Sequence, residues 1–326
     1  MEERISPLRS VRKSFSVVGY AFALLIAVAT TVKLAFLTLP EVMGWDGLTE
    51  QSWWTWVCAS APMYLFAFPA CFLMLRILPG QAPEQHKLSL KQFLTLIPIC
   101  FCMMYAGNLI GTFLSMLLSG GNAVNALNDY AMDDSPLKIL VMVILAPLLE
   151  ELICRKLLID RIACYGEKLS VLMSGLIFGL LHQNLFQFFY AFALGSLFGY
   201  VYIRTGRLRY SVILHTGINF LGAVVAPAVL SLLNMDAINE LAEGTVSVEL
   251  LLEILPGYTV LMAYTTILLG VSVFGLVLLI LKLRHLTWKE TQFAFKPTLK
   301  ASILNVGMIV YSVVCLLMIV LALFNI

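Results

Sequence analysis

The chain has 326 residues, of which 60% are hydrophobic and only 12% are charged. Soluble domains average nearer ~45–50% apolar and ~25% charged residues, so this composition excludes a freely soluble protein. The formal net charge of +2, without a dense basic stripe, excludes nucleic acid as a partner. The seven cysteines are scattered and include no Cys-x-x-Cys pair, so they predict neither a disulfide framework nor a zinc ribbon.

Nine apolar stretches are long enough for transmembrane helices, because a bilayer core needs ~20 apolar residues per helix. The predicted fold class is therefore all-α, a polytopic transmembrane bundle of about nine spans. The fifth and sixth stretches are the shortest, and only the polar patch around His182 separates them. In chain order the predicted spans are 14–39, 53–78, 92–118, 137–159, 169–187, 188–203, 211–234, 257–283 and 302–325.

The charges of the loops predict the orientation. With the N-terminus inside, the cytoplasmic segments hold 19 of the 21 Lys and Arg residues, and the outer loops hold none of them but eleven of the 19 acids. This partition follows the positive-inside rule. It predicts an integral, multi-pass membrane protein with a cytoplasmic N-terminus, in the plasma membrane if the source is bacterial. The cytoplasmic segments are 1–13, 76–91, 155–168, 204–209 and 282–300, and the outer loops are 40–52, 119–136 and 235–256.

A first polar motif, Glu-Glu-x-x-x-Arg, lies near the predicted inner end of the fourth span. Ionisable groups inside apolar helices are costly, so they indicate a functional site by default. Glu151 and Arg155 are four residues apart on one helix face and can pair. Glu150 is rotated by about 100° and has no partner nearby in sequence, which suits a general base. Pro147 lacks an N–H group and leaves the Val143 carbonyl without its helical donor.

Two further motifs follow within about seventy residues of the chain. Phe178 and His182 share a face of the fifth span, so the phenyl ring can hold the imidazole beside a cavity. His215 and Asn219 lie four residues apart in the seventh span and point in one direction. Two aligned donors of that kind can stabilise a developing oxyanion.

Each motif also has a structural interpretation. The acid pair can be an ordinary charged helix end, the intramembrane His182 a partner in a helix–helix hydrogen bond, and the His215–Asn219 pair a polar contact between helices. The conjunction of all three favours a site. Other catalytic templates are missing from the sequence, which has no His-Glu-x-x-His, Gly-x-Ser-x-Gly or phosphate-binding loop. Two histidines and a glutamate can in principle hold a metal, and the spacing leaves that open.

The ordered set Glu-Glu-x-x-x-Arg, Phe-x-x-x-His and His-x-x-x-Asn resembles the CPBP family, the CAAX prenyl proteases and bacteriocin-processing enzymes that are also called the Abi family. The resemblance implies an endopeptidase with its site in a water-filled cavity within the membrane. It implies that Glu150 activates water with help from His182, that His215 and Asn219 form the oxyanion site, and that Glu151, Arg155 and Phe178 support them. It requires no cofactor, although a divalent metal such as zinc on Glu150, His182 and His215 is the alternative.

The resemblance divides the chain into three N-terminal spans (1–136), a four-span catalytic core (137–234), and an outer acidic loop with two C-terminal spans (235–326). The expected partners are the lipid bilayer and a membrane-associated peptide or protein, with a prenylated CAAX protein or a leader peptide as candidates. Two alternatives stay open at this point. One is a non-catalytic scaffold or immunity protein with the same fold, and the other is an ion-coupled transporter, which would show inverted repeats in both halves.

Overall fold

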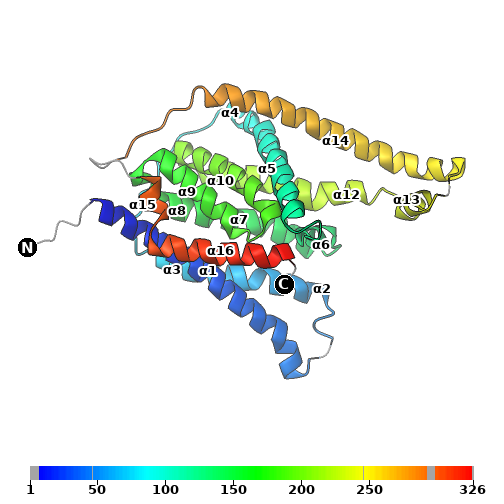
Figure 1. Cartoon of the computed structure of the whole chain (residues 1–326). Helices are drawn as coiled ribbons and strands as arrows, with labels where there is room; N and C mark the ends of the chain where they lie inside the picture. Colours follow the sequence, from blue (N-terminus) through cyan, green and yellow to red (C-terminus); the bar gives the residue numbers. More distant parts are fainter. Residues whose placement is uncertain (1–6, 46, 245, 292–297, 325–326) are drawn as a thin grey trace, which may run out of the picture.

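The computed structural model describes residues 7–45, 47–244, 246–291 and 298–324, and within these ranges every regular element is a helix (Figure 1). Within these ranges the longer helices form nine continuous helical segments, which we call columns, and several of them combine α-helical and π-helical turns. The first four columns are α1 (Pro7–Met43); α2 (Ser52–Ala61), η1 (Pro62–Ala67) and α3 (Phe68–Leu75); α4 (Leu90–Leu94) and α5 (Leu96–Leu118); and η2 (Ile139–Leu145), α7 (Ala146–Glu151), η3 (Leu152–Leu157) and α8 (Leu158–Ile162).

The remaining five columns complete the bundle, and three short helices lie between columns. The columns are α9 (Glu167–Leu181); α10 (Leu185–Thr205); α11 (Leu208–Phe220), η5 (Leu221–Val225) and α12 (Ala226–Leu230); α14 (Val248–Leu283); and α16 (Val306–Phe324). The short helices are α6 (Leu127–Met132), α13 (Met235–Ala242) and α15 (Leu299–Ile303), and a single 3-10 turn, η4 (Ala163–Tyr165), follows α8.

Seven columns of the described chain are long and apolar enough to cross a membrane. The other two are the column 139–162, which carries four charged side chains between Glu150 and Lys156, and the fifteen-residue helix α9. These two columns hold the first two polar motifs. The charges of the first motif lower the apolar character of the column 139–162, whereas α9 is too short at fifteen residues. The prediction of a polytopic, all-helical membrane protein is confirmed.

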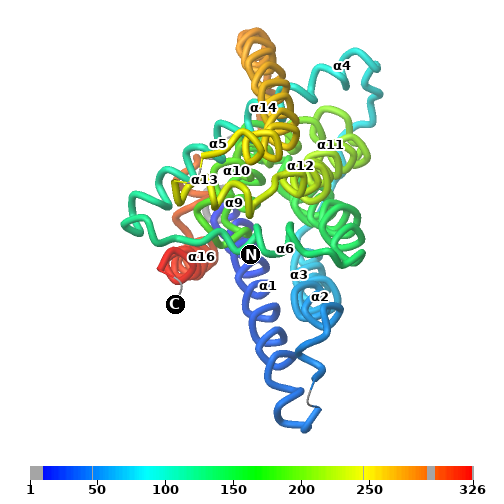
Figure 2. The backbone as a smooth tube through the Cα atoms, turned by 90° about the vertical axis from the view of Figure 1, so that its right-hand side faces the viewer, coloured from blue at the N-terminus to red at the C-terminus, as the bar shows by residue number. Residues whose placement is uncertain are grey.

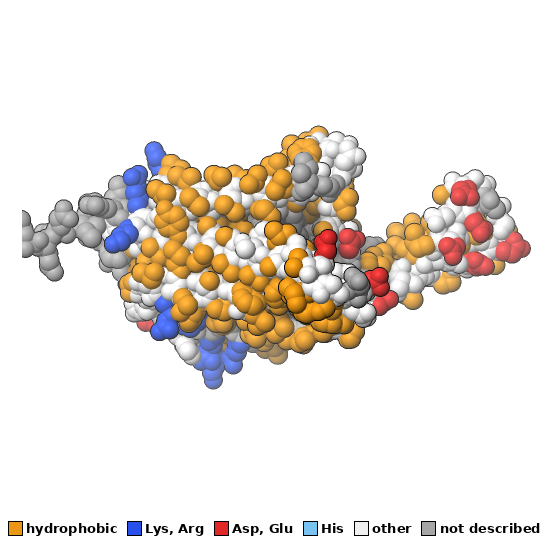
Figure 3. Space-filling view, turned by 90° about the horizontal axis from the view of Figure 1, so that it is seen from below, with side chains coloured by type: hydrophobic (Ala, Val, Ile, Leu, Met, Phe, Trp, Pro, Cys, Tyr) orange, Lys and Arg blue, Asp and Glu red, His pale blue; other side chains and the backbone are white. Residues whose placement is uncertain are grey.

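The surface agrees with this interpretation. Large apolar side chains are exposed along the outward faces of α1, α5, α14 and α16, where a soluble protein would carry charges. Charged side chains gather instead at the two ends of the bundle (Figure 3). Because successive columns run in opposite directions, their connections alternate between these ends. We call them the acidic end, formed by the described residues of the connections 44–45, 47–51, 119–136, 182–184, 231–244 and 246–247, and the basic end, formed by the connections 76–89, 163–166, 206–207 and 284–291.

The boundary between the fifth and sixth spans differs from the prediction. The sequence pattern predicts it between residues 187 and 188, but α9 ends at Leu181 and α10 begins at Leu185. Gln183 adopts a positive φ of 55°, and the Asn184 side chain accepts a hydrogen bond of 2.8 Å from the Gln187 N–H at the start of α10. The polar residues 182–184 are therefore the turn itself, and Leu185, Phe186 and Gln187 belong to the following helix.

Close backbone contacts hold α10 in the centre of the bundle. It packs against α9 on one side and α5 on the other. A Cβ atom added at Gly107 of α5 would lie 2.5 Å from the backbone of Tyr190 in α10, so only glycine permits this approach. Because α10 is fixed in this way, its side chains present a rigid wall to the polar residues of the neighbouring columns.

Candidate active site

A buried ion pair forms the base of the site. Arg155 donates to Glu151 with Nη2 at 3.0 Å from Oε1, and its Nε lies 3.0 Å from Oε2. Both side chains are completely buried. The pairing that the i,i+4 spacing predicts is therefore present. The helix continues to Ile162, however, so Arg155 lies inside the bundle, and its predicted place in a cytoplasmic segment is wrong.

Further contacts fix the guanidinium of Arg155. Its Nη1 donates to Ser174 Oγ at 2.9 Å, and that hydroxyl donates in turn to the Cys154 carbonyl at 2.8 Å. The guanidinium carbon lies 4.7 Å from the centre of the Phe178 ring and 5.9 Å from that of Phe198. A charge that is removed from water needs such compensation. These contacts leave Glu151 with a rigid partner.

Glu151 also contacts the third motif. Its Oε1 lies 3.2 Å from Nδ1 of His215, which is buried in α11. Because an ionised carboxylate only accepts hydrogen bonds, Nδ1 is the donor, and this contact sets the orientation of the ring. The other ring nitrogen, Nε2, lies 3.9 Å from Oε2 of Glu150. His215 therefore stands between the two acids of the first motif.

The two adjacent acids differ in their access to solvent. The side chain of Glu151 is 0% exposed, whereas that of Glu150 is 25% exposed. Glu150 is part of the wall of a cavity of about 460 Å³ and of a smaller adjoining cavity of about 180 Å³. One acid is thus held within an ion pair, and the other faces open space.

His182 ends α9 at the same cavities. Its Nδ1 lies 2.8 Å from the Phe178 carbonyl oxygen, and the two rings meet edge to face with their centres 4.9 Å apart. A carbonyl oxygen only accepts hydrogen bonds, so Nδ1 carries the proton. The remaining nitrogen, Nε2, is then an acceptor in a ring that lines both cavities.

Asn219 lines the larger cavity and also stabilises the fourth column. Its Nδ2 donates to the Met142 carbonyl at 2.8 Å. In η2 the Ala146 N–H bonds to the carbonyl of Val141, five residues earlier. In that register Pro147 stands opposite Met142, and proline has no N–H to give. The carbonyl that Pro147 leaves without a helical donor is therefore that of Met142, not that of Val143, and Asn219 supplies the missing donor.

Glu150 and His182 lie at a similar depth in the bundle, measured along their helices from the basic end. The sequence alone suggests that Glu150 is near the inner end of its span and His182 far from it. In the structure the column of Glu150 extends twelve residues beyond it to Ile162, roughly 18 Å at 1.5 Å per residue. His182 lies fifteen residues beyond Glu167, roughly 22 Å by the same rule. The continuation of the helix past Arg155 makes a shared cavity possible.

The donor set does not resemble a metal site. Across the described residues, no three His, Cys, Asp or Glu side chains gather as ligands for an ion. His215 has one ring nitrogen on Glu151, and His182 has one on a backbone carbonyl. Glu150, His182 and His215 border one cavity without forming a ligand cluster. These residues as placed do not form a binding site for a metal ion.

Sequence reasoning missed Ser174 and Phe198, which hold Arg155. Ser174 stands four residues before Phe178 on α9, and this spacing places the two on one helix face. That signal is available in the sequence but is indistinguishable from ordinary packing. Phe198, in α10, gives no local signal at all, because only the packing of α10 against the fourth column brings it to Arg155 and within 5.6 Å, centre to centre, of the His215 ring.

Comparison with known proteins agrees with the motifs. Residues 133–221 match the family model described as Type II CAAX prenyl endopeptidase Rce1-like. This segment contains all three motifs and overlaps the predicted catalytic core 137–234. No curated protein and no solved structure matches the chain. The resemblance that the motifs indicate is thus confirmed over residues 133–221, where the chain is similar to the type II CAAX prenyl endopeptidases of the CPBP family, intramembrane proteases that act on membrane-associated proteins.

Proposed function

We propose that this protein is an intramembrane endopeptidase in which Glu150 activates water to hydrolyse a peptide bond of a membrane-associated polypeptide. The observation that carries the proposal is the contrast between the adjacent acids. Glu151 is fully buried and paired with Arg155, while Glu150 is partly exposed to a cavity that His182, His215 and Asn219 also line. A general base must reach both water and substrate, and Glu150 is the acid with that access.

The first step joins water to the substrate. Glu150 takes a proton from a water molecule while the water oxygen attacks the carbonyl carbon of the scissile bond. The unprotonated Nε2 of His182 accepts a hydrogen bond from the other O–H of that water and holds the oxygen in place. A carboxylate and an imidazole are sufficient for this activation.

The second step breaks the bond. The tetrahedral intermediate carries its negative charge on the former carbonyl oxygen, which Asn219 stabilises with the amide hydrogen that does not bind Met142. The second donor is Nε2 of His215 in its imidazolium form, in which both ring nitrogens carry protons, and Glu151 holds the ring for that task through Nδ1. Glu150 then passes its proton to the leaving nitrogen, the C–N bond breaks, and a carboxylic acid and an amine are released; the acid loses its remaining proton to solvent.

The test compares membranes that contain wild-type protein with membranes that contain Glu150→Gln at equal abundance. Mass spectrometry of membrane-protein termini is the measurement. A general base contributes about 10²- to 10⁴-fold to a rate, so we expect wild-type-specific termini to disappear in Glu150→Gln. Glu240→Gln, an isosteric change at an exposed site in α13, is the matched control and retains them. Identical profiles for wild type and Glu150→Gln contradict hydrolysis and favour the scaffold alternative.

A further inference from the structure

The cavity that holds Glu150 reaches only one end of the bundle. In the column 139–162 its lining residues Val141, Met142, Ala146 and Glu150 all precede the buried Arg155. In the antiparallel column 208–230, they run from His215 toward Ala223, away from the first turn of α11. Both sets extend from the level of Glu150 toward the acidic end.

Helix α6, within the connection 119–136 at the acidic end, forms part of the cavity wall through Leu127, Asn128, Tyr130 and Ala131. Two contacts hold it there. The Trp56 indole Nε1 donates to Asp133 at 3.3 Å, and the Lys138 ammonium donates to the Ala131 carbonyl at 2.9 Å. Figure 2, which looks onto this end, shows α6 between the helices α1 and α12. The cavity therefore extends from Glu150 to the acidic end, where α6 lines it.

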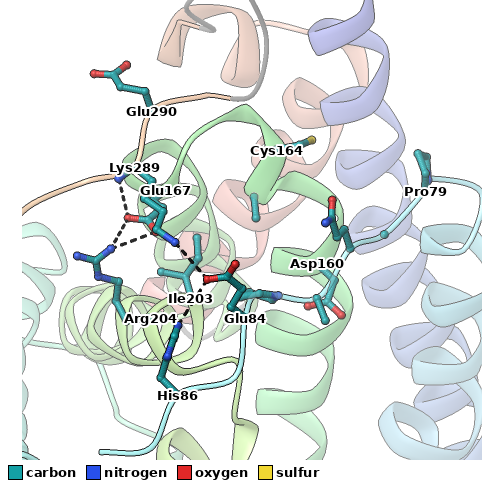
Figure 4. Close-up of a pocket in the computed structure, with 15 residues that line it drawn as sticks. Pro79, Glu84, His86, Asp160, Cys164, Glu167, Ile203, Arg204, Lys289 and Glu290 are labelled. Atoms are coloured by element: carbon teal, nitrogen blue, oxygen red, sulfur yellow. Dashed lines mark hydrogen bonds and ion pairs between the residues drawn. The ribbon is translucent and has the colours of Figure 1, made fainter.

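The basic end is closed between Glu150 and the solvent. Between Glu150 and the basic end lie the fully buried Arg155 and Ser174. Nearer that end lies Tyr202, which is also fully buried and whose hydroxyl donates to Asp160 at 2.7 Å. A larger pocket of about 790 Å³ does open at this end (Figure 4), but none of its described lining residues borders the cavity of Glu150.

Ion pairs hold the structure around that pocket together. Arg204 bonds Glu167 at 3.1 Å, and the Lys289 backbone N–H donates to the same carboxylate at 2.8 Å. Figure 4 shows the Arg204 side chain and the Lys289 backbone meeting at the Glu167 carboxylate, while the Lys289 side chain points toward Glu84. The contacts at Glu167 tie the connection 284–291 to α9 and α10, so this pocket is not a passage to the Glu150 site.

The charges at the two ends of the bundle indicate which side of the membrane the cavity faces. On the face shown in Figure 3, the Lys and Arg side chains lie at the basic end and the Asp and Glu side chains lie mainly at the acidic end. A basic end faces the cytoplasm under the positive-inside rule. We infer that the Glu150 cavity opens to the extracytoplasmic side, beside α6, and takes a membrane-anchored polypeptide whose scissile bond is presented there. This rests on the proposed function for the hydrolysis itself, but not for the direction of access.

The residue types that line the cavity indicate the charge and shape of the substrate segment that it can bind. The described wall contains neither Lys nor Arg, and consists mainly of apolar, aromatic and amide side chains. A free C-terminal carboxylate at the inner leaflet would therefore find no route to Glu150 and no Lys or Arg partner in the described wall. A neutral, extended segment close to the outer leaflet fits both the direction of the opening and its walls.

Labelling of single cysteines tests the direction. The background is the full chain with its seven native cysteines replaced by alanine. Gly222→Cys places a thiol in the cavity wall, where an added Cβ meets no described heavy atom within 4 Å. Gly217→Cys on the same helix is equally open but about 200° away from His215 in rotation, facing lipid. Asn128→Cys reports the mouth and His86→Cys the basic end, since both sites are exposed.

A charged, membrane-impermeant maleimide is added to intact cells or to inverted membrane vesicles. We expect Asn128→Cys and Gly222→Cys to react in intact cells, His86→Cys only in inverted vesicles, and Gly217→Cys in neither. Reaction of Gly222→Cys only in inverted vesicles overturns the inference, as does reaction of Asn128→Cys there. Protection of Gly222→Cys on both sides also overturns it. Because this measurement does not depend on turnover, its failure is distinguishable from a failure of the Glu150→Gln comparison.

Discussion

His215 Nδ1 lies 3.2 Å from Oε1 of Glu151, which joins the third motif to the first across two helices that are 64 residues apart in sequence. Since Glu151 is at the same time bonded to Arg155, the orientation of one imidazole depends on a buried ion pair. Residues that the motif resemblance casts as structural support therefore position a residue of the proposed oxyanion site.

Breaking that ion pair is expected to destabilise the protein strongly. Arg155→Met leaves the Glu151 carboxylate buried without its cation, and removing one partner of a buried pair costs about 3–5 kcal/mol. Thermal unfolding in detergent checks this. The double variant Glu151→Leu/Arg155→Met removes both charges and is expected to be more stable than Arg155→Met alone. An equally unstable double variant would show that shape, not charge, governs the site.

His215→Ala removes a proposed oxyanion donor. Loss of one such donor lowers kcat by about 10²- to 10³-fold, and we expect KM to change little because the donor acts on charge that develops during reaction. Steady-state kinetics on a substrate found by terminal mass spectrometry gives both values. A melting temperature close to that of wild type is the necessary control, and a rise in KM with unchanged kcat would argue for a binding role instead.

Asn219 and Pro147 are expected to be energetically coupled. Asn219→Ala leaves the Met142 carbonyl without its donor, and an unsatisfied buried polar group costs about 1–3 kcal/mol. Pro147→Ala restores a backbone N–H opposite that carbonyl. Asn219→Ala should therefore destabilise the Pro147→Ala background less than it destabilises wild type. A double-mutant cycle of unfolding free energies measures this difference, and strict additivity would contradict the coupling.

Chelation is expected to leave activity intact. The mechanism uses Glu150 and His182 for water activation, and the described residues gather no metal ligands. Peptide hydrolysis is measured before and after treatment with a membrane-permeant chelator, with a zinc endopeptidase in the same vesicles as a positive control. Loss of activity that zinc restores would assign a metal to the site and refute this mechanism.

The close approach of α5 and α10 predicts a steric effect. Gly107→Val places a side chain against the Tyr190 backbone, and overpacking of this kind costs about 1–3 kcal/mol. Gly217→Val is the matched control, because an added Cβ there meets no described atom within 4 Å. Unfolding in detergent should separate the two variants, and equal melting temperatures would mean that the helices can move apart.

The sequence by itself determines the helical columns, because the length of an apolar run is a local property, and a run of about 20 residues is what a helix needs to cross the bilayer core. It also determines the Glu151–Arg155 pair, since residues four apart share a helix face. Even so, it misplaces the turn at His182, because the apolar Leu185 and Phe186 continue the hydrophobic run although they begin the next helix.

Only the tertiary structure decides what depends on the depth and rotation of one helix against another. The Glu151–His215 contact, the Asn219–Met142 hydrogen bond and the place of Phe198 beside Arg155 all join separate columns. Nothing in local hydropathy specifies these distances. The exposure of Glu150 beside the burial of Glu151 has the same origin, since a rotation of about 100° between adjacent residues places one acid at a packed interface and the other at a cavity.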